Sequence, residues 1–247
     1  MRALRFYTPL LLIVLAWQAA ALTGLVSTRI LPSPFAIADA LREIADRDLI
    51  FHTGISIYRQ MTGFLLAAIL GTSLGIAMAR YESVRVIFEP LARITYPLPK
   101  SALLPLLVLW FGIGNNSKIF AVFLGCLLPV LMSAYSGARG VHPQLAWSAR
   151  SLGTRPLALL WKVHFAAALP EILSGLRIAL ALSFTLLVSA EFLIASSGLG
   201  FLIQRLGETG QYPAMFAAVL IVALIGFAAD RLFVALMNRL LRWQTAA

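Results

Sequence analysis

Long apolar runs, separated by short polar segments, dominate the chain. Six of them are candidates to cross a bilayer, because a transmembrane helix needs about 20 mostly apolar residues. They cover approximately residues 8–26, 61–79, 94–114, 119–136, 172–195 and 215–236. Charged residues make up only 12% of the 247 residues, whereas soluble domains average about 25%. The pattern predicts an all-α membrane protein of six transmembrane helices, with residues 1–247 forming a single transmembrane domain.

The third run differs from the others because prolines interrupt it. The apolar stretch 101–114 is short, so this span has to extend back through residues 96–100, which read YPLPK. Irregular backbone at membrane depth is tolerated only where protein or a water-filled cavity surrounds it. The run is therefore predicted to line a pathway, and its candidate pathway residues are Pro99, Pro105 and Trp110.

Basic residues are distributed unevenly between the two sides of this six-run topology. If the N-terminus is inside, fourteen of the 20 Lys and Arg residues lie on the cytoplasmic side. Cytoplasmic loops carry an excess of Lys and Arg, so both termini are predicted to be cytoplasmic. The net charge of +10 does not indicate a nucleic-acid partner, because single basic residues flanking apolar runs are typical of membrane orientation.

The cytoplasmic segment 140–170, between the fourth and fifth runs, carries helix signals and is rich in basic residues. Pro143 suits the first turn of one helix, and Gly153 suits the left-handed residue that ends it. Thr154 can then cap a second short helix whose first turn accepts Pro156. A structured elbow of this kind favours a docking site. An ordinary positive-inside loop is the alternative.

Two more helix boundaries are predicted from prolines. Leu169-Pro170 is expected to break the second elbow helix before the fifth run begins. Ser33-Pro34 is expected to open a helix in the outer loop 27–60. That helix is amphipathic and lies at the outer surface, since three apolar residues share one face: Ile37, Leu41 and Ile44.

Charged residues inside the runs are candidates for function, because ionisable groups in a membrane are costly. Asp230 is adjacent to Arg231 near the cytoplasmic end of the sixth run, so pairing and snorkelling explain both. Glu191 lies near the outer end of the fifth run and has no basic neighbour within one helical turn. Either a pathway or gate role or interfacial packing remains open for Glu191.

The pattern from Gly71 to Gly75 has two interpretations. It matches the G-x-S-x-G of a hydrolase nucleophile elbow, with Ser73 as nucleophile, and it also matches the G-x-x-x-G of packed membrane helices. The nucleophile elbow requires a strand, a turn and a helix, whereas this pattern lies in the middle of an apolar run. Helix packing is therefore favoured.

No metal site or nucleotide-binding loop is predicted for this chain. The histidines lie in different segments without metal-ligand spacing, and we interpret them as surface or interfacial residues: His52, His142 and His164. The single cysteine, Cys126, excludes an intrachain disulfide. No P-loop pattern is present, so the chain is not expected to bind ATP by that route.

Ala149 and Gly153, with the Leu-rich run that ends at Leu169-Pro170, resemble the EAA-G motif of ABC importer permeases with the type I, six-span fold. Other segments are similar to the nitrate/sulfonate/taurine/bicarbonate permease family: LPSPFAIADAL from Leu31, the run 97–114, residues 149–153, Ala190-Glu191-Phe192 and Gly198-Leu199-Gly200. The chain departs from the motif at two positions. Trp147 replaces the family's acidic residue, and Ser148 replaces its first alanine.

The resemblance implies several partners. Such permeases usually form homodimers, and each copy places one cytoplasmic coupling helix against one of two ATP-binding cassette subunits, which hold ATP and Mg. An extracytoplasmic solute-binding protein delivers the substrate. The permease itself binds no cofactor and lies in the bacterial inner membrane. On this resemblance the coupling residues are expected in the elbow: Ala149, Arg150, Gly153, Thr154, Arg155 and Pro156.

The resemblance therefore predicts the membrane-spanning subunit of an ABC importer for a small anion, such as an alkanesulfonate, taurine, nitrate or bicarbonate. Such a subunit is not itself an enzyme. Two alternatives remain: an ion-coupled secondary transporter, and an intramembrane hydrolase that uses Ser73.

Overall fold

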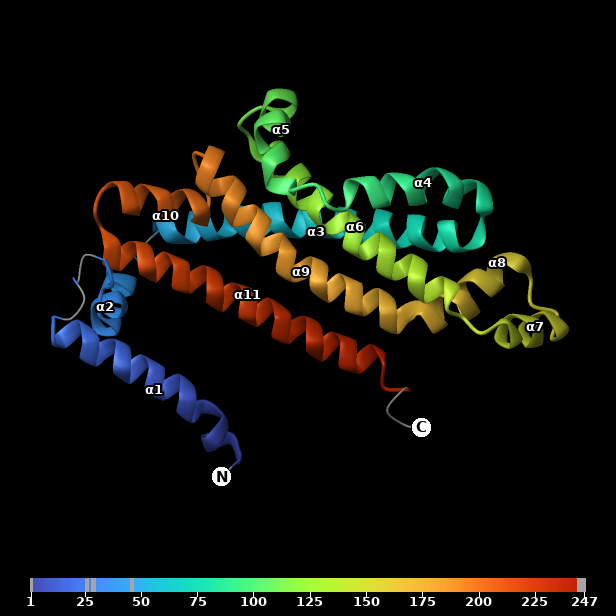
Figure 1. Ribbon diagram of the computed structural model, residues 1–247, viewed down its shortest axis with the longest axis horizontal. Coiled ribbons are helices and arrows are strands. Elements are labelled where there is room, and N and C mark those ends of the chain that lie inside the picture. Colours follow the sequence, from blue (N-terminus) through green and yellow to red (C-terminus); the bar gives the residue numbers. More distant parts are fainter. Residues whose placement is uncertain (1, 25–26, 28–29, 45–46, 244–247) are drawn as a thin grey trace. The chain divides into compact units, whose positions relative to one another are not determined.

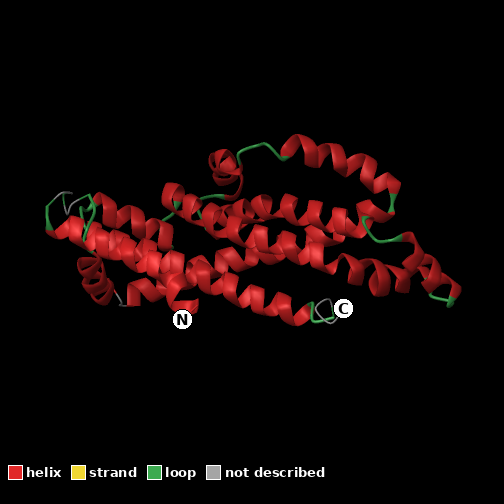
Figure 2. Ribbon diagram, turned by 60° about the horizontal axis from the view of Figure 1, so that its bottom comes forward, coloured by secondary structure: helices red, strands yellow, loops and turns green. Residues whose placement is uncertain are grey.

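The computed structural model describes residues 2–24, 27, 30–44 and 47–243, and every regular element within these residues is a helix (Figure 1, Figure 2). The predicted all-α class is confirmed. The elements are α1 (Arg2–Leu22), α2 (Pro34–Ile44), α3 (Arg47–Arg80), α4 (Glu82–Thr95), the 3₁₀ helix η1 (Lys100–Leu103), α5 (Leu104–Phe111), α6 (Asn115–Arg139), α7 (Pro143–Ser151), α8 (Pro156–Leu159), the π-helix η2 (Leu160–Phe165), α9 (Ala166–Ile194), α10 (Leu199–Glu208) and α11 (Tyr212–Leu240).

Among the described residues, four helical stretches are long and apolar enough to cross a membrane: Asp48–Arg80, Asn115–Arg139, Lys162–Ile194 and Tyr212–Leu240. They correspond to the second, fourth, fifth and sixth predicted runs. Helix α1 has 21 residues, and Leu11–Leu22 is its apolar part among the described side chains. Residues 25–26 of the first predicted run lie outside the described residues. The count of six crossings therefore stays a prediction.

The third predicted run lies in a bent pair of helices, α4 and the helical stretch Lys100–Phe111, which meet at 95°. Pro97 and Pro99 separate the two, and proline has no N–H to continue the hydrogen bonding of α4. Lys100 supplies donors instead. Its Nζ donates hydrogen bonds to the carbonyl oxygens of Tyr96 (3.2 Å) and Leu98 (2.9 Å), and also to that of Thr95. One ammonium group thus stabilises the bend.

The chain forms two compact units, one of residues 1–56 and 191–225 and the other of residues 57–190 and 226–247. The core of the second unit joins α3, α6 and α9. Its buried residues are small or aliphatic apart from one phenylalanine: Phe64, Ala67, Val122, Cys126, Val130, Ala179, Leu180 and Leu187.

Three glycines of α3 allow its backbone to approach α6 closely. A Cβ on Gly75 would lie 2.5 Å from the carbonyl oxygen of Leu131 and 2.7 Å from the Cβ of Ala134. A Cβ on Gly63 or Gly71 would also be within about 3 Å of α6 atoms. The glycines at positions 71 and 75 therefore belong to a helix-packing motif, as favoured from the sequence.

In the first unit, α2 begins at Pro34, where Ser33-Pro34 predicted a helix. The Ser33 Oγ accepts a hydrogen bond from the Ala36 N–H at 3.2 Å and so caps this helix. Ile37 is buried, with 5% of its surface exposed. The predicted outer loop 27–60 is shorter than expected, because α3 already begins at Arg47.

The predicted break at Leu169-Pro170 is wrong. Helix α9 contains Pro170 and continues to Ile194, and it follows η2 without a gap. A proline inside a helix removes one backbone hydrogen bond. The residues on both sides of it are packed, since Ala168 exposes 0% and Ile172 exposes 2% of its surface. Burial of this turn outweighs the lost bond, as is common where neighbouring helices surround a proline.

Two glycine-to-alanine changes in α3 should have opposite effects. Gly75→Ala inserts a methyl group against α6 and should destabilise the protein by about 1–3 kcal/mol. Gly54→Ala meets no atom within 4 Å and should stabilise the helix by about 0.4–1 kcal/mol. Thermal unfolding of the purified protein in detergent measures both shifts. Equal shifts would contradict the close approach at Gly75.

Candidate functional site

The elbow, residues 140–170, contains two short helices joined by a tight turn. Helix α7 starts with Pro143 at its first position, and Gly153 has a φ of 77° just after it, as predicted. Helix α8 starts with Pro156. The residue directly before α8 is Arg155, whose carbonyl oxygen accepts the hydrogen bond of the Leu159 N–H at 2.9 Å. Arg155 thus occupies the N-cap position, one residue later than the predicted cap at Thr154.

Main-chain hydrogen bonds alone explain why Ala149 and Gly153 are spaced as they are. The Thr154 N–H donates to the Ala149 carbonyl oxygen at 3.0 Å, and the Gly153 N–H donates to that of Arg150 at 2.9 Å. These two bonds form a Schellman motif, in which the residue with positive φ is usually glycine. The space around Gly153 is open, since a Cβ added there would have no other atom within 4 Å. Only its backbone conformation favours glycine here.

The elbow presents apolar and basic side chains to its surroundings. Leu145 and Trp147 on α7 expose 52% and 63% of their surfaces, and Leu152 exposes 86%. Arg150 and Arg155 are exposed as well. Large apolar side chains gathered at the surface mark sites of protein or membrane contact. These exposures fit a surface that another protein or the membrane covers.

The predicted pathway residues of the third run lie around the bend. Pro99 is the N-cap of η1, and Pro105 is in the first turn of α5. Both are exposed, and Trp110 exposes 62% of its surface near the end of α5. Glu191 belongs to the other compact unit.

Glu191 is completely buried, with 0% of its surface exposed. Its Oε2 accepts a hydrogen bond from the Ser56 hydroxyl at 2.7 Å and another from the Gly200 N–H at 3.1 Å. The Ser56 hydroxyl oxygen in turn accepts from the Leu199 N–H at 2.8 Å. His52 Nδ1 accepts from the Gly198 N–H at 3.0 Å.

These three side chains cap the start of α10. The first N–H groups of a helix have no partners within it, and here side chains from two other helices supply the acceptors. The N-terminal end of a helix carries the positive end of its dipole, so a carboxylate is stabilised there. Gly198 has a φ of 112°, and a Cβ at this position would overlap the Glu191 carboxylate. We call this group, His52, Ser56, Glu191 and Gly198, the α10 cap.

Two members of the α10 cap are not identifiable from the sequence pattern. The interpretation of His52 as a surface or interfacial residue is wrong, since it exposes only 6% of its surface. His52 and Ser56 are four residues apart and therefore share one face of α3. This spacing indicates that the two side chains can act together. The N–H groups that they bind, of Gly198 and Leu199, are more than 140 residues away along the chain.

The predicted pairing of Asp230 with Arg231 is also wrong. The two carboxylate oxygens of Asp230 accept hydrogen bonds from Arg177 of α9, at 2.7 Å from Nε and 3.0 Å from Nη2. The Arg231 guanidinium lies 4.9 Å from the centre of the Phe227 ring. A planar guanidinium binds a carboxylate through two parallel bonds, so the pair joins α9 to α11.

Two basic residues counted as flanking charges are buried beside the start of α6. Arg59 exposes 3% of its surface, and its Nε donates a hydrogen bond to Asn115 Oδ1 at 2.9 Å. Lys118 exposes 1%, and its Nζ donates to the Ile113 carbonyl oxygen. Both therefore have structural contacts that their position beside an apolar run does not reveal.

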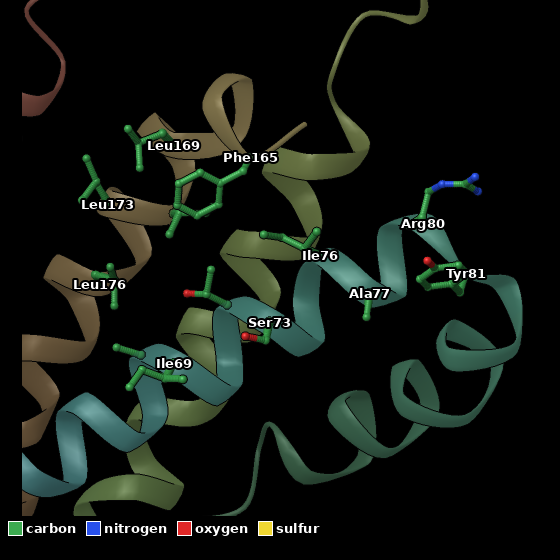
Figure 3. Close-up of a pocket in the computed structure, with 13 residues that line it drawn as sticks. Ile69, Ser73, Ile76, Ala77, Arg80, Tyr81, Phe165, Leu169, Leu173 and Leu176 are labelled. Carbon is green, nitrogen blue, oxygen red and sulfur yellow. The ribbon is translucent and has the colours of Figure 1, made fainter. Parts of the chain in front are cut away.

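Ser73 lines a cavity of about 550 Å³ in the second unit (Figure 3). A serine nucleophile requires a neighbouring base, and the described residues that line this cavity include no His, Asp, Glu or Lys. The geometry therefore gives no support to a hydrolase. Among the described residues, no three His, Cys, Asp or Glu side chains are grouped so as to hold a metal ion.

Comparison with protein families gives one match that covers most of the chain. The family model described as "Binding-protein-dependent transport system inner membrane component" matches residues 63–242. The taurine transport system permease protein TauC of Escherichia coli K12 is 37% identical over 240 residues, which cover 95% of this chain and 87% of TauC. The putative aliphatic sulfonates transport permease protein SsuC of Bacillus subtilis 168 is 35% identical, over 95% of this chain and 85% of its own.

A solved structure with a similar fold is an inward-facing conformation of the MetNI methionine ABC transporter. The matched chain superposes with a TM-score of 0.53 at 18% sequence identity, and the match covers 83% of this chain and 97% of that one. At this identity the similarity establishes the fold alone.

Proposed function

Because the chain belongs to the family of binding-protein-dependent transport system inner membrane components, we propose that it forms the membrane pathway of an ATP-driven importer for alkanesulfonates such as taurine. The membership confirms the resemblance to ABC importer permeases. One observation carries the substrate class: relatives at least 35% identical over 95% of the chain are named for taurine and aliphatic sulfonates.

In this proposal the chain catalyses no reaction, and a separate ATP-binding cassette subunit hydrolyses ATP. A solute-binding protein delivers the sulfonate to the outer face, and two copies of the chain enclose the pathway. The bent third run, with Pro99, Pro105 and Trp110, lines that pathway. Nitrate and bicarbonate are expected to be poor substrates.

Uptake measurements test this function. The chain is reconstituted in proteoliposomes with its ATPase subunit and binding protein, and accumulation of radiolabelled taurine is followed. Accumulation should require ATP and both partners. Accumulation driven by a proton or sodium gradient without ATP would identify a secondary transporter. ATP-dependent uptake of nitrate or bicarbonate, but not of sulfonates, would make only the substrate class wrong.

We further propose that the elbow is the coupling segment and lies in the cytoplasm. It combines a rigid turn with exposed apolar and basic side chains, which suit an ATPase surface. The proposed coupling residues are the turn and its neighbours: Ala149, Arg150, Gly153, Thr154, Arg155 and Pro156. A cysteine at position 155, in a Cys126→Ser chain, should then react with impermeant reagents only from the inside. Labelling from the outside would reverse the topology.

Gly153→Val should weaken coupling without preventing insertion. A left-handed conformation costs a residue with a Cβ about 1–2 kcal/mol, so the native turn should be populated roughly 5- to 30-fold less. ATPase association and taurine uptake should fall together. Gly54→Val is the matched control, because that position is also open but lacks a positive φ. Normal uptake by the Gly153→Val chain would show that the elbow is only a connection.

Glu191 is proposed as a positioning residue that stabilises the α10 cap. Glu191→Gln keeps a carbonyl acceptor for Ser56 and the Gly200 N–H and should be mild. Glu191→Ala leaves that buried N–H without its acceptor, which costs about 1–3 kcal/mol. Thermal unfolding and ATP-driven uptake should therefore both rank Gln above Ala. A Gln variant that unfolds normally but does not transport would instead indicate a proton-transfer role.

A further inference from the structure

The cavity next to Ser73 has long apolar walls (Figure 3). Ile69 and Ile76 line it from α3, while Phe165 and Leu173 line it from η2 and α9. Its volume of about 550 Å³ is within the range of roughly 300–1,000 Å³ that is usual for ligand sites. An apolar cavity of this size in a membrane protein can take a hydrocarbon chain.

One basic side chain, that of Arg80, lies at one end of the cavity. Arg80 is the last residue of α3, and its guanidinium lies 5.5 Å from the centre of the Tyr81 ring. In Figure 3 the Arg80 side chain points away from the apolar walls. None of the described residues that line the cavity is acidic.

From this juxtaposition we infer that the cavity binds one acyl chain of an anionic phospholipid, whose phosphate lies at Arg80. Arg80 ends a helix that is long enough to cross the membrane, so its side chain reaches the depth of the headgroups. Basic pockets between transmembrane helices bind anionic headgroups. A sulfonate substrate fits less well, because only hydroxyls, such as that of Ser73, interrupt the apolar walls away from this end.

The bound lipid would contact both the transmembrane helix α3 and the elbow. Arg80 and Ile76 belong to α3, whereas Phe165 and Leu169 belong to the elbow. A lipid in contact with both segments would hold Phe165 and Leu169 of the elbow in place beside α3. This effect on coupling rests on the proposed function, whereas the binding of the lipid does not.

The test therefore measures lipid binding to the purified chain and does not depend on a transport assay. The full chain is purified, exchanged into nanodiscs of phosphatidylcholine with a minor fraction of phosphatidylglycerol, released, and analysed by native mass spectrometry. The wild-type chain should retain phosphatidylglycerol in preference to phosphatidylcholine. Arg80→Gln should reduce this preference roughly 5-fold, the effect of one basic residue at a membrane surface. Ile69→Trp, at a lining position that is 63% exposed, should abolish retention by filling the cavity.

Matched controls separate the site from general effects. Arg93→Gln removes the same charge from α4, and Leu70→Trp adds the same ring at the next residue of α3, which does not line the cavity. Both should retain lipid as the wild type does. An unchanged preference in Arg80→Gln, or unchanged retention in Ile69→Trp, would overturn the inference. So would a disulfide between two Ser73→Cys chains in membranes, because a second copy would then cover the cavity.

Discussion

Close backbone contact along α6 is the interaction on which the second unit depends. Lipid tails are as apolar as leucine, so helices in a bilayer associate through van der Waals packing and hydrogen bonds, without a hydrophobic force between them. Gly63 and Gly75 of α3 face α6, and on the α9 side Gly137 and Gly175 allow a similar approach. A helix with neighbours at this distance on two sides is held in place along most of its length, which gives the segments connected to its ends a fixed base.

In both units, side chains that lie outside a helix stabilise one of its ends. Lys100 supplies donors to the carbonyl groups at the end of α4, and the α10 cap supplies acceptors to the N–H groups at the start of α10. In an apolar environment each unmatched group would be costly. Lys100 and Glu191 therefore each satisfy backbone groups at a helix end. The contacts of Glu191 are those of the positioning role proposed above.

Local patterns explain what could be predicted from the sequence. Hydropathy located the four long helices and the broken third run, and proline and glycine located the turn at Gly153, because these signals depend only on neighbouring residues. The α10 cap could not be predicted, since Ser56 and Glu191 are 135 positions apart. The same holds for the pair of Arg177 and Asp230, separated by 53 positions. The break expected at Pro170 failed because burial outweighed a local rule.

The turn at Gly153 has a consequence for how such a chain can diverge. Its hydrogen bonds run between main-chain atoms, of Ala149, Arg150 and their partners, so the exposed positions of α7 do not influence its shape. Trp147 occupies one of these exposed positions, where the resemblance to the EAA-G motif leads us to expect an acid, and the turn forms with the indole in that place. Recognition and geometry are thus encoded by different atoms. In the proposed coupling role, substitutions at exposed positions of α7 can change which ATPase surface fits, while the same main-chain turn continues to present them.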